Sequence, residues 1–419
     1  MQTRLHPDII ATDRGREAER ILRSCVHCGF CNATCPTYQL LGNELDGPRG
    51  RIYLIKGALE AGEAQPLLKT HLDRCLTCRA CETTCPSGVE YGKLLDIGRA
   101  MIEANDARAP WDKGARWLLR QVVGESSTLR PVLQIGQALA PYMPAALRAK
   151  VPASDADLPW PAPRHAERVL LLTGCAQDAA TPSVNLHIAR LLDSLGVSAL
   201  PADGCCGALD WHLGATAAGA TRMRGNVRDW STALDEGAIA VLSSASGCGV
   251  HVKEYAHMLP GEAAAARVGA ATQDIAEFLS KRMTQVKRVT RPLRVAWHAP
   301  CSLQHGQRIT GVVERLLLAA GHELVAVNDT HLCCGSAGTY SILQPTIATQ
   351  LQQRKLTHLT ANRPDVIATA NVGCQMHLAS GIASGIASGI ASESTEPGGG
   401  RAARLKVVHW TELLRDVWE

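Results

Sequence analysis

Two short stretches of the sequence each carry four cysteines at the same spacing and end in a proline. Three thiolates on one tight loop bind three corners of a [4Fe–4S] cluster, whereas the fourth cysteine of such a run binds the cluster of the other run. The spacing C-x-x-C-x-x-C-x-x-x-C-P therefore predicts two [4Fe–4S] clusters with exchanged fourth ligands. Cluster 1 is assigned to Cys25, Cys28, Cys31 and Cys85, and cluster 2 to Cys75, Cys78, Cys81 and Cys35.

Other chemistries of cysteine fit this pattern less well. Zinc is an alternative for these residues, but zinc sites take four ligands, usually as two separated pairs, which differs from a run of four cysteines. A disulfide framework is typical of secreted chains. Two complete copies of the run, each with its proline, argue against chance.

Composition limits the function classes. The chain has 419 residues, a formal net charge of +4 and 46% hydrophobic residues, so packed cores are expected and nucleic-acid binding is not. The N-terminal segment is charged and has no apolar core of a signal peptide, and no run of about 18 apolar residues is present. The 16 cysteines are therefore expected to stay reduced in a cytoplasmic protein that does not span a membrane.

Residues 1–108 are expected to form an α-helical ferredoxin-like domain around the two clusters. The spacer between the cysteine runs has apolar residues at helical spacing, among them Ile52 and Ile55, and Gly62 is suited to end that helix. Further helices are expected over 66–74 and 90–105. The connection between the runs is thus helical, where compact bacterial ferredoxins use short β-rich connections.

Residues 109–166 are expected to connect this domain to the rest of the chain. The segment starts with helical patterning and becomes proline-rich over 151–166, which favours an extended, exposed linker. Between these parts, 129–150 is amphipathic with basic ends. It either lies on a membrane surface or packs as a helix against its own protein.

The remainder of the chain repeats itself. Landmarks ending at Cys175, Cys206 and Cys248 recur at Cys301, Cys334 and Cys374, so a duplication is expected. Each copy alternates β-branched runs with helical stretches, which predicts two α/β modules, module 1 over 167–285 and module 2 over 286–419. The fold class is therefore α+β multidomain. A Gly/Ser repeat in module 2 is interpreted as a surface loop over 380–400 without chemistry.

Each module supplies one lone cysteine, one Cys-Cys-Gly and one later cysteine. Adjacent cysteines can both face one metal centre, and the glycine lets the backbone approach it closely. Buried structural thiols are the alternative for individual members. If the modules pack about a pseudo-two-fold axis, both Cys-Cys-Gly turns point into one crevice. The candidate additional metal site comprises Cys175, Cys205, Cys206, Cys248, His251, Cys301, Cys333, Cys334, Cys374 and His377.

The repeated pattern resembles the cysteine-rich CCG domain of heterodisulfide reductase and its relatives. The resemblance implies a non-cubane [4Fe–4S] cluster held by five cysteines, the last two in a C-x-x-C. Here the last position is His251 in one copy and His377 in the other. Histidine binds iron in Rieske centres, so these residues either complete further clusters or mark their loss.

Taken together, the two cysteine runs and the two CCG modules resemble the iron–sulfur subunit of bacterial glycolate oxidase. The stretches that carry the resemblance are CVHCGFCNATCPTYQLLGNELDGPRGRIYLIK, HLDRCLTCRACETTCPSGVEYGKLLDIGR, SGCGVHVKEY, HLCCGSAGTYSILQP and NVGCQMHLA. The resemblance implies that FAD-bearing partner subunits oxidise glycolate to glyoxylate. This chain then passes the electrons to a quinone or other membrane acceptor. The chain itself is expected to be bound peripherally on the cytoplasmic face of the inner membrane.

The residues themselves agree with a role in electron transfer. The chain has no dinucleotide-binding fingerprint and no acid–base constellation, so no catalytic residue is assigned and FAD is expected on partner subunits only. Basic residues near the cysteine runs are either a solvated face or a charge that stabilises reduced clusters: Arg23, Arg49, Arg51, Arg74 and Arg79.

Three other functions remain open. The chain is alternatively the iron–sulfur subunit of a related glycerol-3-phosphate or lactate dehydrogenase, or a catalytic subunit like that of heterodisulfide reductase. In the third alternative its C-terminal half only binds partners.

Overall fold

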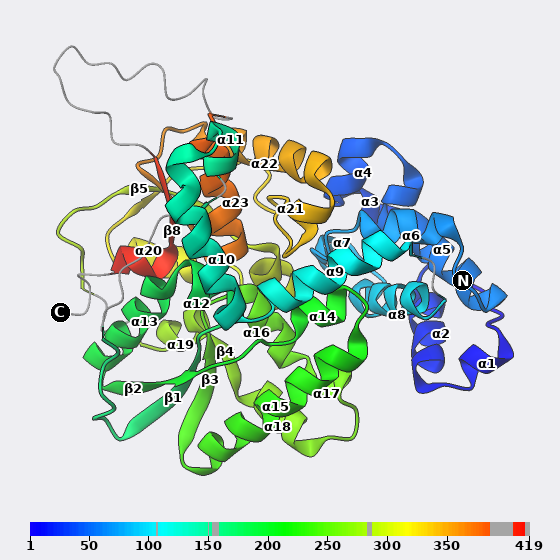
Figure 1. Ribbon diagram of the computed structural model, residues 1–419, viewed down its shortest axis with the longest axis horizontal. Coiled ribbons are helices and arrows are strands. Elements are labelled where there is room, and N and C mark those ends of the chain that lie inside the picture. Colours follow the sequence, from blue (N-terminus) through cyan, green and yellow to red (C-terminus); the bar gives the residue numbers. More distant parts are fainter. Residues whose placement is uncertain (106–107, 150, 153–158, 283–286, 386–404, 415–419) are drawn as a thin grey trace.

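The computed structural model describes residues 1–105, 108–149, 151–152, 159–282, 287–385 and 405–414. Figure 1 shows helices of the first 105 residues (blue to cyan) on one side of the molecule and the strands on the other. Two α/β modules follow the helical part, which confirms the expected fold class.

The first 105 residues are helical around one apolar core. That core includes Ile21, Ile55 and Leu94, none of which is exposed. The predicted helices are present, and the spacer helix ends at Gly62, whose positive φ of 80° suits glycine. The helices are α1 (Pro7–Ile10), α2 (Asp13–Ser24), α3 (Phe30–Ala33), α4 (Pro36–Leu41), η1 (Glu44–Asp46), α5 (Pro48–Ala61), α6 (Pro66–Asp73), α7 (Ala80–Thr84) and α8 (Tyr91–Ala104).

The connector is helical in its first half. It contains α9 (Pro110–Val123), α10 (Ser126–Leu139), η2 (Ala140–Tyr142) and α11 (Ala145–Arg148). Helix α10 packs on α12 of module 1, yet it has no buried residue. The proline-rich end was expected to be exposed linker, but the Trp160 indole donates a hydrogen bond to the Ala199 carbonyl (2.8 Å). This part of the linker therefore packs along the edge of the first sheet.

Module 1 is built on a parallel sheet with strand order β2-β1-β3-β4. Crossover helices join the strands, as a parallel sheet requires. Its elements are β1 (Glu167–Leu172), α12 (Cys175–Ala180), α13 (Pro182–Ser194), β2 (Val197–Ala202), α14 (Ala208–His212), α15 (Thr216–Asp235), β3 (Ala238–Ser243), α16 (Ser246–Lys253), α17 (Tyr255–Met258), α18 (Ala263–Ala271), β4 (Thr272–Asp274) and α19 (Ile275–Ser280).

Module 2 repeats this topology as β6-β5-β7-β8, again with parallel strands. Helix α23 extends to Ala383, so the first residues of the Gly/Ser repeat are helical and the predicted loop starts later than 380. The rest of that loop, from 386, lies outside the described residues. The elements are β5 (Arg294–His298), η4 (Ser302–Gly306), α20 (Val312–Ala319), β6 (Glu323–Leu324), α21 (Tyr340–Leu343), α22 (Pro345–Thr360), β7 (Val366–Thr369), α23 (Val372–Ala383), β8 (Lys406–His409) and η5 (Trp410–Leu414).

The two modules share one core. Val169 of β1, Ile188 of α13, Val295 of β5 and Leu316 of α20 belong to the same buried apolar cluster. The cysteines come at the carboxyl ends of the strands or in the helices that follow, where ligand sites of parallel sheets usually lie.

Candidate iron–sulfur sites and CCG modules

The two cysteine runs adopt the same loop geometry. Positive φ angles occur at His27 (58°) and Gly29 (85°) in the first run, and at Thr77 (55°) and Arg79 (60°) in the second. These are the second and fourth positions after the first cysteine of each run. A β-branched residue rarely adopts positive φ, so the Thr77 backbone is held by its surroundings. Such a backbone lets cysteines three residues apart face the same side.

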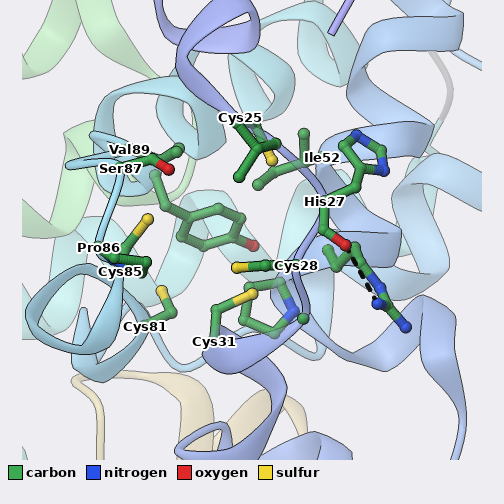
Figure 2. Close-up of a pocket in the computed structure, with 15 residues that line it drawn as sticks. Cys25, His27, Cys28, Cys31, Ile52, Cys81, Cys85, Pro86, Ser87 and Val89 are labelled. Atoms are coloured by element: carbon green, nitrogen blue, oxygen red, sulfur yellow. Dashed lines mark hydrogen bonds between the residues drawn. The ribbon is translucent and has the colours of Figure 1, made fainter.

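Site one is defined by Cys25, Cys28, Cys31 and Cys85, which line one cavity. Figure 2 shows their sulfur atoms around the same space, with Cys81 at its edge. The cysteine from the second run is thus next to the three from the first. Four convergent thiols are the donor set that a [4Fe–4S] cluster requires, so the residues present fit that group.

Burial shapes the chemistry of site one. It raises the pKa of the Cys31 thiol to about 11, and the neighbouring Cys25 and Cys85 add to the increase. The pKa of Cys25 is raised chiefly by burial as well. Cys28, in contrast, is exposed. Bound iron is therefore needed to hold the buried thiols as thiolates, and one edge of the site faces solvent.

Site two is defined by Cys35, Cys75, Cys78 and Cys81. Burial raises the pKa of Cys81 well above its usual value, and Cys78, Cys75 and Cys35 are close enough to raise it further. The Tyr91 hydroxyl donates a hydrogen bond to the Cys75 sulfur (3.6 Å). The structure thus brings together the second predicted set, again with one cysteine from the other run.

Arg51 is the cation closest to site two. Its side chain is 1% exposed, and it donates hydrogen bonds to the His71 carbonyl (2.8 Å) and to Cys35 Sγ (3.9 Å). Burial lowers the pKa of Arg51, but nearby thiols and Asp46 more than offset this effect. A buried cation at this position favours the reduced, more negative state of a bound cluster.

The other predicted arginines form ion pairs: Arg23 with Glu19, Arg49 with Glu44, Arg74 with Asp46, and Arg79 with Glu82 and Glu254. Arg99 was not predicted. It donates hydrogen bonds to the Cys75 carbonyl (2.9 Å) and to Thr77 Oγ1 (2.8 Å), so it fixes the strained second loop.

Site two touches module 2. The Cys301 thiol lies close to Cys333 and to Cys78 of site two, and these neighbours together with burial raise its pKa. Two hydrogen bonds hold the contact: the Tyr340 hydroxyl donates to the Arg74 carbonyl (3.0 Å), and Thr83 Oγ1 lies 2.9 Å from His305 Nδ1. The sequence showed no sign of this proximity, because 223 residues separate Cys78 from Cys301.

The thiols of module 1 contact one another at the strand ends. Cys175 Sγ lies 3.6 Å from Cys205 Sγ, and Cys206 lies close enough to Cys205 and Cys248 for both to raise its pKa. Gly207 has a φ of 87°, as expected for the turn. His251 is buried, and both of its ring nitrogens lack hydrogen-bond partners in the described part of the chain. Its pKa is lowered to about 3 by burial, so it is neutral and fits the role of a ligand.

The thiols of module 2 form a longer row. Cys301, Cys333, Cys334 and Cys374 are neighbours in that order, and each thiol shifts the pKa of the one before it. A Cβ on Gly335 would lie 2.6 Å from the Ala348 carbonyl oxygen, so only glycine fits after the cysteine pair. In module 1, His251 lies near Asp96, His212 and Cys205, whereas in module 2 Cys301 lies near Cys78. The two sets of thiols thus have different neighbours, whereas the sequence predicted one crevice shared by both Cys-Cys-Gly turns.

Two residues near the module 2 thiols were missed by sequence reasoning. His298, the last residue of β5, is 2% exposed and its Nε2 has no hydrogen-bond partner among the described residues. Lys355 is equally buried and donates a hydrogen bond to the Asp329 carbonyl (2.7 Å). The one sequence signal for His298 is its place as the first residue of an H-x-x-C motif that ends at Cys301. The predicted His377 lies near His298, with its Nε2 3.4 Å from the Ala348 carbonyl oxygen.

Comparisons with known protein families match both halves of the chain. Residues 21–89 match the family model described as a 4Fe-4S dicluster domain. Residues 169–253 and 295–379 each match the model described as a cysteine-rich domain. In the described part of the chain, no helix is long and apolar enough to cross a membrane.

Curated relatives extend this match to the whole chain. The glycolate oxidase iron-sulfur subunit of Escherichia coli is 46% identical, over 100% of both chains. The probable glycolate oxidase iron-sulfur subunit of Bacillus subtilis is 30% identical over 95% of this chain and 94% of its own. Lactate utilization protein A of Geobacillus kaustophilus is 28% identical and covers 59% of this chain and 98% of its own. The chain therefore belongs to the family of glycolate oxidase iron–sulfur subunits.

Proposed function

We propose that this chain is the electron-transfer subunit of a glycolate-oxidising complex. In this complex an FAD-bearing partner oxidises glycolate to glyoxylate, and this chain carries the electrons to a quinone or another membrane acceptor. The observation that carries the proposal is the pair of four-thiol sites, with site two in contact with module 2. Full-length similarity to a glycolate oxidase subunit supports the choice of substrate. Lactate utilization protein A covers a smaller share of the chain.

We assign the ligands of two [4Fe–4S] clusters to the two sites. Site one supplies Cys25, Cys28, Cys31 and Cys85, and site two supplies Cys35, Cys75, Cys78 and Cys81. Each cluster, when bound, accepts and releases one electron. The chain's own residues set the surroundings: a solvent-facing edge at site one, and the buried Arg51 at site two.

The exposed edge of site one suits an approaching flavoprotein. Cys28 is exposed there, and the neighbouring Val26 (68% exposed) and Phe30 (61%) flank it in the same loop. Large exposed apolar side chains beside a redox site favour docking of a protein partner, because docking removes them from water. We therefore place the electron-donating FAD subunit at this edge.

We place the exit of the electrons at site two. The proximity of Cys78 to Cys301 connects site two directly to a thiol of module 2. The buried Lys355 lies near Cys301, Cys333 and Cys334 and favours negative charge on those sulfurs. We propose that electrons leave through module 2, and that module 1, as far as the chain is described, has no equivalent thiol contact with either site.

The test uses the complex assembled with its FAD subunits. Cys301→Ser should leave the reduction of flavin by glycolate intact and lower the rate of quinone reduction severalfold. Cys175→Ser, the equivalent change in module 1, should leave both rates near those of wild type. The purified chain alone should not oxidise glycolate. Glycolate-dependent dye reduction by the isolated chain, or equal effects of the two variants, would contradict the proposal.

A further inference from the structure

We propose that module 2 holds a single Zn²⁺ ion, bound by the imidazole of His298 and the thiolates of Cys334 and Cys374. This site is separate from the two cluster sites, and its test does not depend on glycolate oxidation. The three ligand atoms lie within 4.8 Å of one another. No other set of three His, Cys, Asp or Glu residues converges this closely in the described part of the chain.

The spacing of the three atoms favours one ion over a cluster. Bonds of about 2.0–2.3 Å around a tetrahedral ion place its ligand atoms about 3.3–3.8 Å apart, which falls within the 4.8 Å that encloses the three atoms here. In an iron–sulfur cluster each thiolate binds a different iron atom, so the sulfurs are held farther apart. Mixed imidazole and thiolate ligands in a tetrahedral set are typical of zinc.

A second, independent observation concerns His298 itself. A buried imidazole nitrogen without a hydrogen-bond partner costs about 1–3 kcal/mol. His298 Nε2 is such an atom, and the residue is 2% exposed. A metal ion bound to the imidazole supplies the missing interaction.

Charge balance also fits a divalent ion. Cys334 is buried and Cys374 is partly buried, so their two thiolate charges are costly without compensation. Binding of Zn²⁺ releases the two thiol protons of Cys334 and Cys374 to solvent and leaves a neutral site. Lys355 lies near Cys301, Cys334 and Cys333, so its single positive charge is shared among these three sulfurs.

Module 1 lacks this site because of one residue. Alignment of Cys175 with Cys301 places Leu172 of β1 at the position of His298. The equivalents of the two thiols, Cys206 and Cys248, are present but have no imidazole from the strand. The duplication has thus produced one module with an imidazole at the end of its first strand and one with leucine there.

The test measures metal content in the full chain purified without oxygen. Wild type should contain about one zinc atom in addition to the roughly eight iron atoms of two cubane clusters. His298→Leu installs the residue of module 1 and removes a buried unpartnered nitrogen, so the fold should be retained. This variant should lose the zinc and keep the iron. Cys374→Ser should do the same.

Two matched variants serve as controls. Cys248→Ser and Leu172→Ala, at the equivalent positions of module 1, should keep the zinc. Titration with Co²⁺ should give thiolate-to-cobalt charge-transfer and tetrahedral d–d bands in wild type. The affinity of His298→Leu should fall by more than the ~10–100-fold that loss of an outer-shell partner costs.

Three outcomes would overturn the proposal. The first is wild-type protein without zinc and without cobalt bands. The second is His298→Leu protein with a full complement of zinc. The third is iron beyond about eight atoms that disappears with His298→Leu, because this result would assign a cluster to module 2 instead of a single ion.

Discussion

At the scale of residues, the backbone of each cysteine run decides which thiols can share a site. The paired positive φ angles at His27 and Gly29, and at Thr77 and Arg79, turn three thiols of each run toward one side. The fourth cysteine of each run starts or ends a short helix: Cys35 caps α4, whose first residue is Pro36, and Cys85 ends α7. Each fourth thiol consequently faces the other site.

The exchange of the fourth ligands can be tested with one substitution. Cys85→Ser should impair the cluster of site one, although Cys85 belongs to the second run. Its thiol lies with those of Cys25 and Cys31, and a serine hydroxyl is a poor ligand for iron. EPR of the reduced protein should show one altered cluster signal and one unchanged signal.

The complementary variant identifies which signal belongs to which site. Cys35→Ser should alter the signal that Cys85→Ser leaves unchanged. If Cys85→Ser alters the same signal as Cys75→Ser, the fourth ligands are not exchanged.

At the scale of elements, the junction between the modules depends on a buried carboxyl group. Asp274 caps helix α19: its Oδ1 accepts a hydrogen bond from the Ala276 amide (3.0 Å). Its Oδ2 accepts one from Gln307 of module 2 (3.2 Å). Burial raises the pKa of Asp274 to about 7, although the Ala276 amide and Lys253 oppose the shift.

This pKa predicts a pH-dependent stability. The folded-state pKa of about 7 lies above the unfolded value, so the protonated form stabilises the fold at low pH. That stabilisation is lost as the pH rises through 7. Asp274→Asn cannot ionise and keeps an oxygen for the cap. Relative to wild type, the free energy of unfolding of this variant should therefore be higher at pH 8 than at pH 5, by up to a few kcal/mol. Melting temperatures measured at both pH values check this difference.

The control for this prediction is a carboxylate with the opposite shift. Burial acts to raise the pKa of Asp193, but its hydrogen bonds with Arg164 and His165 outweigh that effect and lower it. Asp193→Asn should therefore destabilise the chain to a similar extent at pH 5 and pH 8. An Asp274→Asn difference that is equally independent of pH would show that Asp274 is ionised throughout this range.

At the scale of the whole molecule, helices α9 and α10 present an apolar surface to solvent. Half of the large apolar side chains that are exposed in the described residues lie between 110 and 149. Trp111 is 78% exposed, Trp117 56%, Ile135 61% and Tyr142 87%. Figure 1 shows α9 and α10 running one after the other across the front of the molecule. Tryptophan and tyrosine on an exposed amphipathic helix are typical of attachment to a membrane surface.

Peripheral attachment through this surface predicts a measurable loss on mutation. The double variant Trp117→Ser, Ile135→Ser should lower binding to anionic vesicles at least about tenfold, because each large apolar side chain contributes roughly 1.5–3 kcal/mol on burial. Sedimentation with vesicles measures the bound fraction. High salt or alkaline washing should release the wild-type chain, as no described helix reaches spanning length.

The matched control carries the same substitutions at the other exposed apolar patch. Val26→Ser, Phe30→Ser should leave vesicle binding unchanged and weaken association with the FAD subunit. Equal loss of vesicle binding in both double variants would indicate non-specific adsorption, and no loss in either would leave α9 and α10 to a protein partner.

The sequence alone determined the features that depend on local spacing. Two C-x-x-C-x-x-C-x-x-x-C-P runs predicted both thiol sets, because loop geometry and ligand number leave few arrangements for such a run. The repeat of about 126 residues predicted two α/β modules, since hydrophobic periodicity is a local signal, and the structure shows that their sheets have the same strand order. The helices between the runs were predicted for the same reason.

Only the tertiary structure decided how these parts meet. The contact of Cys78 with Cys301, the burial of Arg51 beside Cys35 and the convergence of His298 with Cys334 and Cys374 all join residues distant in sequence. The hydrogen bond of Trp160 to Ala199 of β2 likewise anchors a linker whose described residues are otherwise without helix or strand, as its composition suggested. Such contacts depend on the packing of whole elements against one another, and residue types and spacing carry no record of that packing.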